Sequence, residues 1–505
     1  MKLRRDTPPK GTLRDWVDAR AEAGGMALSF PDEGTALDWP SLRNRARAIA
    51  ALLTARGIAK GESVAILHPN GQAAIEAIYG TLYGGFRATM INLVAGTEAI
   101  GYALDHSGAR VALVHPTQES VFQSVNPGGR IAMLNMAESA PETVLHPVTP
   151  DDHALLMYTS GTTGRPKGVV HTQASLLAGG WTTTIAHDLT PEDTGLCVLP
   201  VYHINGLCVS VMGSLVSGGQ LAMCARFSAS RFWQQAAETR ATWFSVVPTI
   251  VSHLLHGETG PDPETRRRLR FGRSASSPLP VEVHTAFEAR FDLPIVETMG
   301  LTETAAQILS NPLPPGTRKI GSPGIAYGNL AEVAGPDMRP LPPGQEGEII
   351  VKGPNVMLEY LRNPEATRDS FTPDGWLRTG DLGRKDAEGY FFVTGRLKEL
   401  IIKGGENIAP REIDEVLYAH PDVVEAAAFS CPCPRYGERV EAAVALRPGS
   451  TLTPETLLTL CKDRLGAFKS PDHIHFLDEL PKGPSGKIQR VRLKSLLAGD
   501  LERNS

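Results

Sequence analysis

The residues Tyr158-Thr159-Ser160-Gly161-Thr162-Thr163-Gly164-Arg165-Pro166-Lys167-Gly168 form the most informative stretch of this sequence. An apolar run, 154–158, precedes the loop and Val169-Val170 follows it, which predicts a strand, a polar loop and a second strand. Such a loop offers backbone N–H groups, four hydroxyls and two cations, which suit an anion with several oxygens, above all a polyphosphate. A plain hairpin turn is the alternative, because Gly, Ser and Pro are common in turns.

The stretch is not a Walker A loop, which requires G-x-x-x-x-G-K-[ST] at the start of a helix. Gly161 and Gly164 are too close together, and Gly168 follows Lys167 where Ser or Thr would be needed. A P-loop kinase or ATPase is therefore disfavoured.

The size and composition of the chain favour an ordinary globular protein. With 505 residues it is too long for one core, so two or more domains are expected. A net charge of −5 indicates neither a nucleic-acid partner nor a membrane surface. No apolar run approaches ~18 residues, and the first residues do not resemble a secretory signal. The six cysteines are scattered without zinc-ligand spacing, and we expect a reduced cytoplasmic protein.

Helical and strand patterns alternate near the start of the chain, which predicts parallel α/β layers. Ser41 is expected to cap the second helix. We expect helices at 13–23, 41–56, 72–83 and 97–106, and strands at 35–39, 63–67, 88–92 and 111–114. Beyond residue 400, we expect helices at 410–419 and 453–466, and strands at 423–430, 440–446 and 473–477.

Polar motifs follow the loop in a fixed order. They lie at 200–206, 243–249, 270–279, 297–304, 375–381, 390–399, 400–408 and 481–490. Taken singly, each has an ordinary explanation. His203 would be a core histidine, Arg273 a surface arginine and Lys487 part of a solvated tail.

Taken together, the motifs resemble those of the adenylate-forming superfamily, which includes acyl-CoA synthetases, peptide-synthetase adenylation domains and beetle luciferases. The chain is identified by this resemblance as an AMP-forming acyl-CoA synthetase. The motifs run from 158 to 490, and the α/β pattern before them also fits. The resemblance implies an α/β fold with a large N-terminal domain, residues 1–396, of layered βαβ-type sheets and helices. A small mobile α+β lid domain, residues 397–505, would carry the catalytic lysine.

The resemblance also implies roles for single residues. ATP would be bound by Thr159, Ser160, Gly161, Thr162, Thr163, Gly164 and Lys167 at its phosphates, and by Ser274, Ala275, Ser276, Met299 and Gly300 at its base. Thr302 would contact the α-phosphate, Glu303 would hold Mg²⁺, and Asp381 and Arg396 would bind the ribose. Gly404, Gly405 and Glu406 would contribute to the thiol tunnel, and Lys398 would be the hinge. The acid would lie near His203, Val247, Arg273 and Gln307.

The implied reaction has two steps and uses ATP, Mg²⁺ and coenzyme A. The acid's carboxylate oxygen attacks the α-phosphorus of ATP, giving an acyl-adenylate and pyrophosphate. A thiol then displaces AMP and forms the thioester. Lys487, Mg²⁺ and the loop N–H groups would stabilise the charge of the first step, with Thr302, Glu303 and His203 as further catalytic residues. Rotation about Lys398 would withdraw Lys487 for the second step.

The acid is less clearly indicated. Residues 270–312 are similar to the oxalate–CoA ligase branch, but Ala306 and Gln307 stand where oxalate ligases carry a histidine. A slightly larger small anion, such as sulfoacetate or a short dicarboxylate, is therefore expected. A medium-chain, long-chain or aromatic acid remains open, as do a luciferase-like oxygenase and a non-catalytic AMP-binding module. No carrier domain follows residue 505, which favours free CoA. A monomer and a homodimer are both compatible with the sequence.

Overall fold

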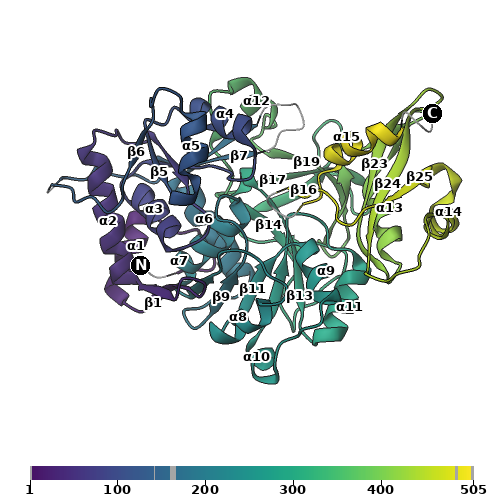
Figure 1. The fold of residues 1–505 in the computed structure, drawn as a ribbon, viewed down its shortest axis with the longest axis horizontal. Coiled ribbons are helices and arrows are strands. Elements are labelled where there is room, and N and C mark those ends of the chain that lie inside the picture. The colour runs from purple at the N-terminus through teal and green to yellow at the C-terminus, as the bar shows by residue number, and fades with distance from the viewer. Residues whose placement is uncertain (1–2, 142, 160–165, 484–486, 502–505) are drawn as a thin grey trace.

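Two large sheets form most of the molecule. The computed structural model describes residues 3–141, 143–159, 166–483 and 487–501 (Figure 1). The first sheet is seven-stranded, in the order β18 (Glu359–Tyr360), β8 (Lys167–Thr172), β7 (His153–Thr159), β4 (Arg87–Met90), β3 (Ser63–Leu67), β5 (Val111–Val114) and β6 (Ala132–Leu134). Strands β7, β4, β3, β5 and β6 pair in parallel, whereas β7 and β8 form an antiparallel hairpin.

The second sheet is nine-stranded and mostly parallel. Its order is β15 (Ile325–Ala326), β14 (Ala306–Ser310), β13 (Ile295–Leu301), β12 (Phe271–Ser274), β11 (Trp243–Val246), β9 (Thr194–Cys197), β10 (Gln220–Met223), β1 (Met26–Phe30) and β2 (Thr35–Asp38). The parallel strands from β1 to β13 place their carboxyl ends at one edge, where ligand-binding residues gather in sheets of this kind.

The helices of this part of the chain separate and cover the sheets. They are α1 (Leu13–Ala23), α2 (Trp39–Ala55), α3 (Gln72–Tyr83), α4 (Thr97–Ser107), α5 (Glu119–Val125), α6 (Gln173–Ala186), α7 (Gly213–Ser217), α8 (Phe232–Glu238), α9 (Pro248–His256), α10 (Pro263–Arg268), α11 (Val281–Phe291) and α12 (Pro364–Asp369). Helix α6 is buried on nearly all sides, as expected of a helix enclosed by other elements. A π-helix, Asn205–Met212, precedes α7, and short 3₁₀ turns span Pro116–Gln118 and Thr302–Thr304.

Two smaller sheets follow in the chain. The antiparallel four-stranded sheet contains β16 (Leu330–Ala334), β17 (Glu346–Lys352), β19 (Leu377–Lys385) and β20 (Phe391–Arg396). The last sheet contains β22 (Glu406–Ile408), β21 (Ile401–Lys403), β24 (Gly437–Leu446), β23 (Val423–Cys433) and β25 (His473–Phe476). Helices α13 (Pro410–Tyr418), α14 (Pro454–Lys469) and α15 (Arg490–Leu501) accompany it. These C-terminal elements form the yellow and light green end of the molecule in Figure 1, and the α/β architecture expected from the sequence is confirmed.

One detail of the first helices corrects the sequence-based expectation. Helix α2 begins at Trp39, and its cap is Asp38, whose side chain accepts a hydrogen bond from the backbone N–H of Ser41. The expectation that Ser41 caps the helix is therefore wrong. Asp38 has extended backbone angles, as a capping residue requires, whereas Ser41 already lies inside the first turn.

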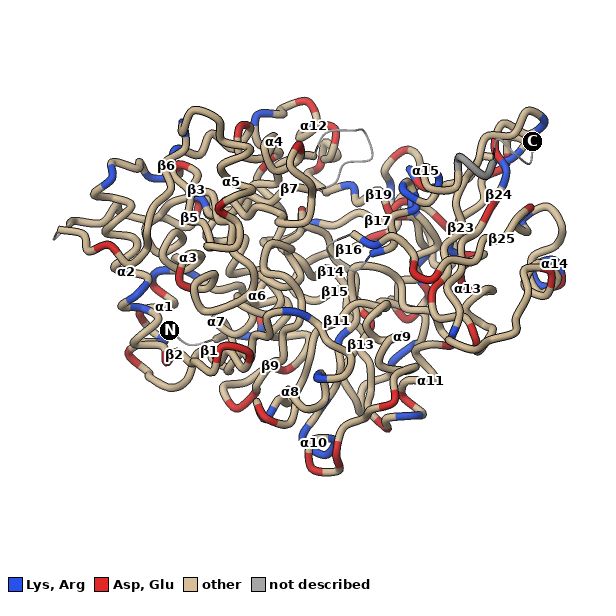
Figure 2. Tube along the Cα trace, in the orientation of Figure 1, with Lys and Arg blue, Asp and Glu red and all other residues tan. Residues whose placement is uncertain are grey.

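Charged residues of both signs are interspersed over the fold. Figure 2 shows lysine, arginine, aspartate and glutamate along all parts of the trace, with no face of a single sign in this view. Within the described part of the chain, no helix is long and apolar enough to cross a bilayer.

Candidate active site

Strands β7 and β8 bring the two ends of the polar loop together. Thr159 pairs with Lys167, the last pair of the ladder before the connecting segment. The predicted phosphate ligands Ser160, Gly161, Thr162, Thr163 and Gly164 lie outside the described residues.

Tyr360 connects Lys167 to Glu303. Strand β18 pairs with β8, and the Lys167 ammonium lies 4.5 Å from the centre of the Tyr360 ring. The Tyr360 hydroxyl donates a hydrogen bond to Glu303 Oε1 at 2.7 Å. Burial and the neighbouring Glu303 carboxylate raise the pKa of Tyr360, so its hydroxyl stays protonated and remains a donor. The sequence did not single out Tyr360, which the pairing of β18 with β8 brings beside Lys167.

Glu303 fits a magnesium ion that is shared with phosphate oxygens. In the described residues, no group of three or more His, Cys, Asp and Glu side chains could hold a metal. Mg²⁺ typically takes one or two protein carboxylates and completes its shell with phosphates and water. The single carboxylate of Glu303, oriented by Tyr360, matches that donor set.

His171 fixes the position of Thr302. It lies on β8, is fully buried, and its Nε2 donates a hydrogen bond to the Thr302 carbonyl oxygen at 2.6 Å. Burial lowers the pKa of His171 to about 4, so the imidazole is neutral at physiological pH. The 3₁₀ turn Thr302–Thr304 is thereby tied to the strand that follows the polar loop. The sequence offered one signal for this residue, a histidine four positions after Lys167.

Asp381 and Arg396 form the predicted ribose pair on neighbouring strands. They are partners in the register of β19 and β20, and Arg396 Nε donates to Asp381 Oδ1 at 2.5 Å. Asp381 is buried and its carboxylate is held in one orientation by the guanidinium. The structure thus brings together two predicted site residues from neighbouring strands.

The predicted base-binding residues come from two adjacent strands. Ser274 ends β12, and Ala275 and Ser276 follow it at the carboxyl edge. Ser276 has φ of +76°, an unfavourable conformation for a residue with a side chain. Met299 is buried on β13. A Cβ on Gly300 would lie 1.6 Å from the Ala306 carbonyl oxygen, so glycine is required there.

His203 and Val247 lie where chain segments leave the second sheet. His203 stands two residues before the π-helix, and its ring centre is 5.1 Å from that of Tyr202. Burial lowers the pKa of His203 to about 4, and its buried Nε2 has no partner among the described residues. Val247 is buried and immediately precedes α9. A neutral imidazole can donate or accept a hydrogen bond but adds no charge.

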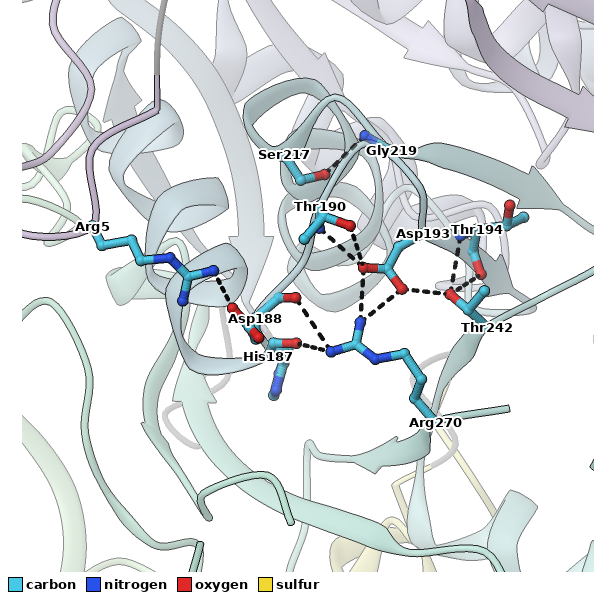
Figure 3. Close-up of polar contacts among 10 residues, drawn as sticks. All are labelled: Arg5, His187, Asp188, Thr190, Asp193, Thr194, Ser217, Gly219, Thr242 and Arg270. Carbon is cyan, nitrogen blue, oxygen red and sulfur yellow. Dashed lines mark hydrogen bonds and ion pairs between the residues drawn. The ribbon is translucent and has the colours of Figure 1, made fainter. Parts of the chain in front are cut away.

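Two arginines, one just before β12 and one near its carboxyl end, differ in their partners. Arg270, just before β12, donates two hydrogen bonds of 2.7 Å to Asp193 and two more to the carbonyl oxygens of His187 and Asp188 (Figure 3). Arg273, on β12, is 1% exposed, and in the part of the chain that the structure describes no carboxylate pairs with it. The interpretation of Arg273 as a surface residue is therefore wrong.

The contacts of Arg273 are to neutral groups. Its Nη1 donates to Asn205 Oδ1 at 2.9 Å and to Ser245 Oγ at 3.2 Å, while its Nε has no partner among the described residues. Burial lowers the pKa of Arg273 to about 9, which still leaves the guanidinium charged at pH 7. A buried cation without an anion is costly unless a ligand supplies the charge. Asn205 and Ser245 were not identified from the sequence.

Gln307 lies near the same buried region. It is fully buried on β14 and its Nε2 donates to the Thr182 carbonyl oxygen on α6 at 3.2 Å. The pKa of His187 is lowered by burial and by the charge of Arg273. The cluster around Arg273 therefore consists of polar groups without a negative charge.

Lys487 approaches the ribose pair from the C-terminal part of the chain. Its Nζ lies 3.4 Å from Glu399 Oε1. Burial lowers its pKa, which also responds to the charges of Glu399, Arg396 and Asp381. The predicted hinge residue Lys398 is exposed in the turn between β20 and β21.

The predicted thiol-tunnel residues form a hairpin. Lys403 pairs with Glu406, and Gly404 and Gly405 between them have φ of +59° and +87°. Two positive angles in a two-residue turn are favourable for glycine. Gly404, Gly405 and Glu406 are exposed, whereas Lys403 is buried.

The family described as "AMP-binding enzyme" matches residues 16–361, and its C-terminal domain matches residues 412–487. The sulfoacetate–CoA ligase of Cupriavidus necator is 46% identical over 92% of this chain and 94% of its own length. The oxalate–CoA ligase of Arabidopsis thaliana is 37% identical over 88% of this chain and 90% of its own.

Among solved structures, ATP-bound MatB from Rhodopseudomonas palustris superposes with a TM-score of 0.89 at 30% identity, covering 96% of this chain and 98% of that one. The apo form of the same protein gives only 0.75 at 29% identity, covering 97% and 99%. The overall arrangement described above is thus closer to the ATP-bound form.

Proposed function

We propose, since the chain belongs to the AMP-binding enzyme family and is an ATP-dependent acid–CoA ligase, that its acid substrate is small and carries a second negative charge. Sulfoacetate is the first candidate. The single observation that carries this choice is the buried Arg273, whose charge is not matched by any carboxylate among the described residues. The relative with 46% identity acts, by its name, on such an acid.

The residues around Arg273 describe how a small dianion would be held. A sulfonate or second carboxylate would accept hydrogen bonds from the guanidinium, whose Nε is unpartnered among the described residues. Asn205, which already accepts from Arg273, also donates through Nδ2 to Ser276 Oγ at 3.3 Å. Asn205 would therefore connect the distal anion to the segment proposed to bind the nucleotide base. The reacting carboxylate would lie toward neutral His203 and Val247.

The proposed roles of the nucleotide residues follow their placement. Asp381 would accept hydrogen bonds from the ribose hydroxyls, oriented by Arg396. Glu303 would hold Mg²⁺, which neutralises phosphate charge when bound. Thr302 would contact the α-phosphate, and Lys487 would stabilise the negative charge that develops there during acyl-adenylate formation.

We further propose the boundary between the two domains at residues 396 and 397, with Lys398 as the hinge. Strand β20 of the four-stranded sheet ends at Arg396, and the C-terminal sheet begins at Ile401. We also propose that the protein acts in the cytoplasm on free CoA, as a monomer or a homodimer. The cysteines are free within the described structure, in keeping with a reducing compartment.

Oxalate is the second candidate, since the Arabidopsis relative is named for it. It has two carbons and no spacer between its carboxylates, whereas sulfoacetate places a methylene between the two anions. The presence of Ala306 and Gln307 after the Thr302–Thr304 turn, where oxalate ligases carry a histidine, favours the longer acid.

A panel of acids tests this proposal. Acetate, propionate, oxalate, malonate, sulfoacetate, benzoate and octanoate would be compared by CoA-dependent release of AMP. We expect sulfoacetate to give the highest kcat/KM. Arg273→Met should lower kcat/KM for sulfoacetate by about 10- to 100-fold, because charge-assisted hydrogen bonds are lost, and should change that for propionate much less. Turnover of only octanoate or benzoate would refute the small-dianion proposal.

A further inference from the structure

Helix α9 forms a direct contact with the C-terminal sheet. Ser252 Oγ donates to the Val424 carbonyl oxygen at 2.8 Å, and His253 Nε2 lies 3.4 Å from Glu425 Oε1. Helix α9 begins immediately after Val247, which is proposed to line the acid site. The contact therefore connects the part of the large domain that is proposed to bind the acid substrate with strand β23.

Glu425 also fixes the chain segment that leads to Lys487. Its carboxylate accepts a hydrogen bond from the Leu480 N–H at 3.0 Å and pairs with Lys482 Nζ at 2.7 Å.

The Lys482 segment in turn pairs with the residues around Lys487. Lys482 forms a β-bridge with Ile488, and the Gly483 N–H donates to the Lys487 carbonyl oxygen at 2.7 Å. Lys482 is thus held by Glu425 at one side and aligned with the Lys487 backbone at the other.

The position of Glu425 makes these contacts strong. The residue is 2% exposed, and burial acts to raise the pKa of its carboxyl group. The hydrogen bond from the Leu480 N–H and the close approach of His253 and Lys482 outweigh burial and leave the pKa of Glu425 below its ordinary value. The side chain is therefore an ionised, buried group whose partners come from both domains.

We propose that Glu425 is a positioning residue for Lys487, which it orients for acyl-adenylate formation by joining α9 to Lys482, the β-bridge partner of Ile488 next to Lys487. Rotation of residues 397–505 would separate His253 and Ser252 from the C-terminal sheet. The contacts of Glu425 with Leu480 and Lys482 would move with the rotating unit. The α9 contact thus stabilises only the orientation in which Lys487 faces the nucleotide site. The inference rests on the two-step reaction proposed above.

Two variants test this role, and each removes a different interaction. Glu425→Gln keeps an acceptor for Leu480 but removes the charge, and His253→Ala removes the His253–Glu425 contact while Ser252 still bonds to Val424. Acid-dependent pyrophosphate exchange would report the first half-reaction, using the best acid of the panel. Thioester formation from synthetic acyl-adenylate and CoA would report the second. Glu425→Gln should lower kcat of exchange about tenfold, or ~1.4 kcal/mol, with KM values nearly unchanged.

His253→Ala should have a smaller effect in the same direction, about threefold, because the histidine is partly exposed. Neither variant should slow thioester formation.

Glu441 provides a matched control within the same sheet. It is fully buried and pairs with Arg439 at 2.7 Å and His475 at 2.8 Å, both of which belong to the C-terminal unit. Glu441→Gln and His475→Ala should affect the two half-reactions equally or leave both unchanged.

Unchanged pyrophosphate exchange in Glu425→Gln would overturn the inference, as would equal losses in both half-reactions or the same selective loss in Glu441→Gln. A wild-type enzyme inactive in both half-reactions with every acid would instead refute the proposed function itself.

Discussion

The ammonium of Lys487 lies 3.4 Å from the carboxylate of Glu399, the residue that directly follows the proposed hinge Lys398. Arg490 Nε approaches the other oxygen of Glu399 at 3.7 Å. The proposed catalytic lysine and the proposed hinge are therefore joined through one side chain. When no phosphate is near, Glu399 supplies the anion that Lys487 requires. Rotation at Lys398 would change this contact together with the position of the C-terminal unit.

Replacement of Lys487 by alanine should abolish the first half-reaction and spare the second. The ammonium stabilises charge that develops only during adenylation, so we expect pyrophosphate exchange to fall at least ~100-fold. Thioester formation from preformed acyl-adenylate should remain near the wild-type rate. Unchanged exchange in this variant would refute the role of the lysine.

The first half-reaction should lose activity at a lower alkaline pH than an ordinary lysine would give. Burial lowers the pKa of Lys487, so the ammonium is lost as the pH rises through a value below the usual ~10.4. Glu399 opposes this shift. Glu399→Gln should therefore move the alkaline fall of pyrophosphate exchange to still lower pH, as measured from its pH–rate profile. A shift toward higher pH would contradict the assigned electrostatic role.

Substitution of Lys398 by proline should permit adenylation and block thioester formation. Proline fixes φ near −65° and so prevents the backbone change that a hinge requires. Lys398→Ala is the matched control, because it removes the side chain and keeps the backbone free. Separate assays of the two half-reactions would show the difference, and normal overall turnover in Lys398→Pro would remove the hinge assignment.

Addition of one methyl group at Gly300 should destabilise the large domain. The new Cβ would overlap the Ala306 carbonyl oxygen at the register shift between β13 and β14. We expect Gly300→Ala to lower the free energy of unfolding by ~3 kcal/mol or more, or to prevent soluble expression. Gly213→Ala is the control, since its Cβ would meet Thr183 at an ordinary 3.7 Å. Equal thermal midpoints for the two variants would contradict the steric argument.

Several elements could be predicted from local sequence patterns. The helix at 13–23 and the strands at 63–67 and 111–114 are confirmed at their expected bounds. Strand β1, Met26–Phe30, was missed because a short strand is stabilised mainly by its neighbours, here β2 and β10. The cap at Asp38 was missed because Asp38 also ends β2.

The residues of the candidate site likewise divide into those that local motifs indicate and those that only tertiary packing brings together. Glu303 and Asp381 were proposed from the sequence because their motifs are contiguous in the chain. Tyr360, Asn205 and Ser245 were not, because each reaches its partner through strand pairing or helix packing between distant segments. Arg273 was identified, but its burial could not be judged from sequence, since a lone arginine is usually exposed.

The sequence by itself determined the class of chemistry. The loop at 158–168 and the ordered motifs after it specify an enzyme that handles a nucleotide and a carboxylate, because short contiguous segments carry the groups proposed to contact phosphate, ribose and metal. Only the tertiary structure decided which charges are neutralised within the protein. It paired Arg270 with Asp193 and left Arg273 beside neutral partners among the described residues. Charge balance in a buried site depends on distance and desolvation, and both are set by packing between residues far apart in the chain.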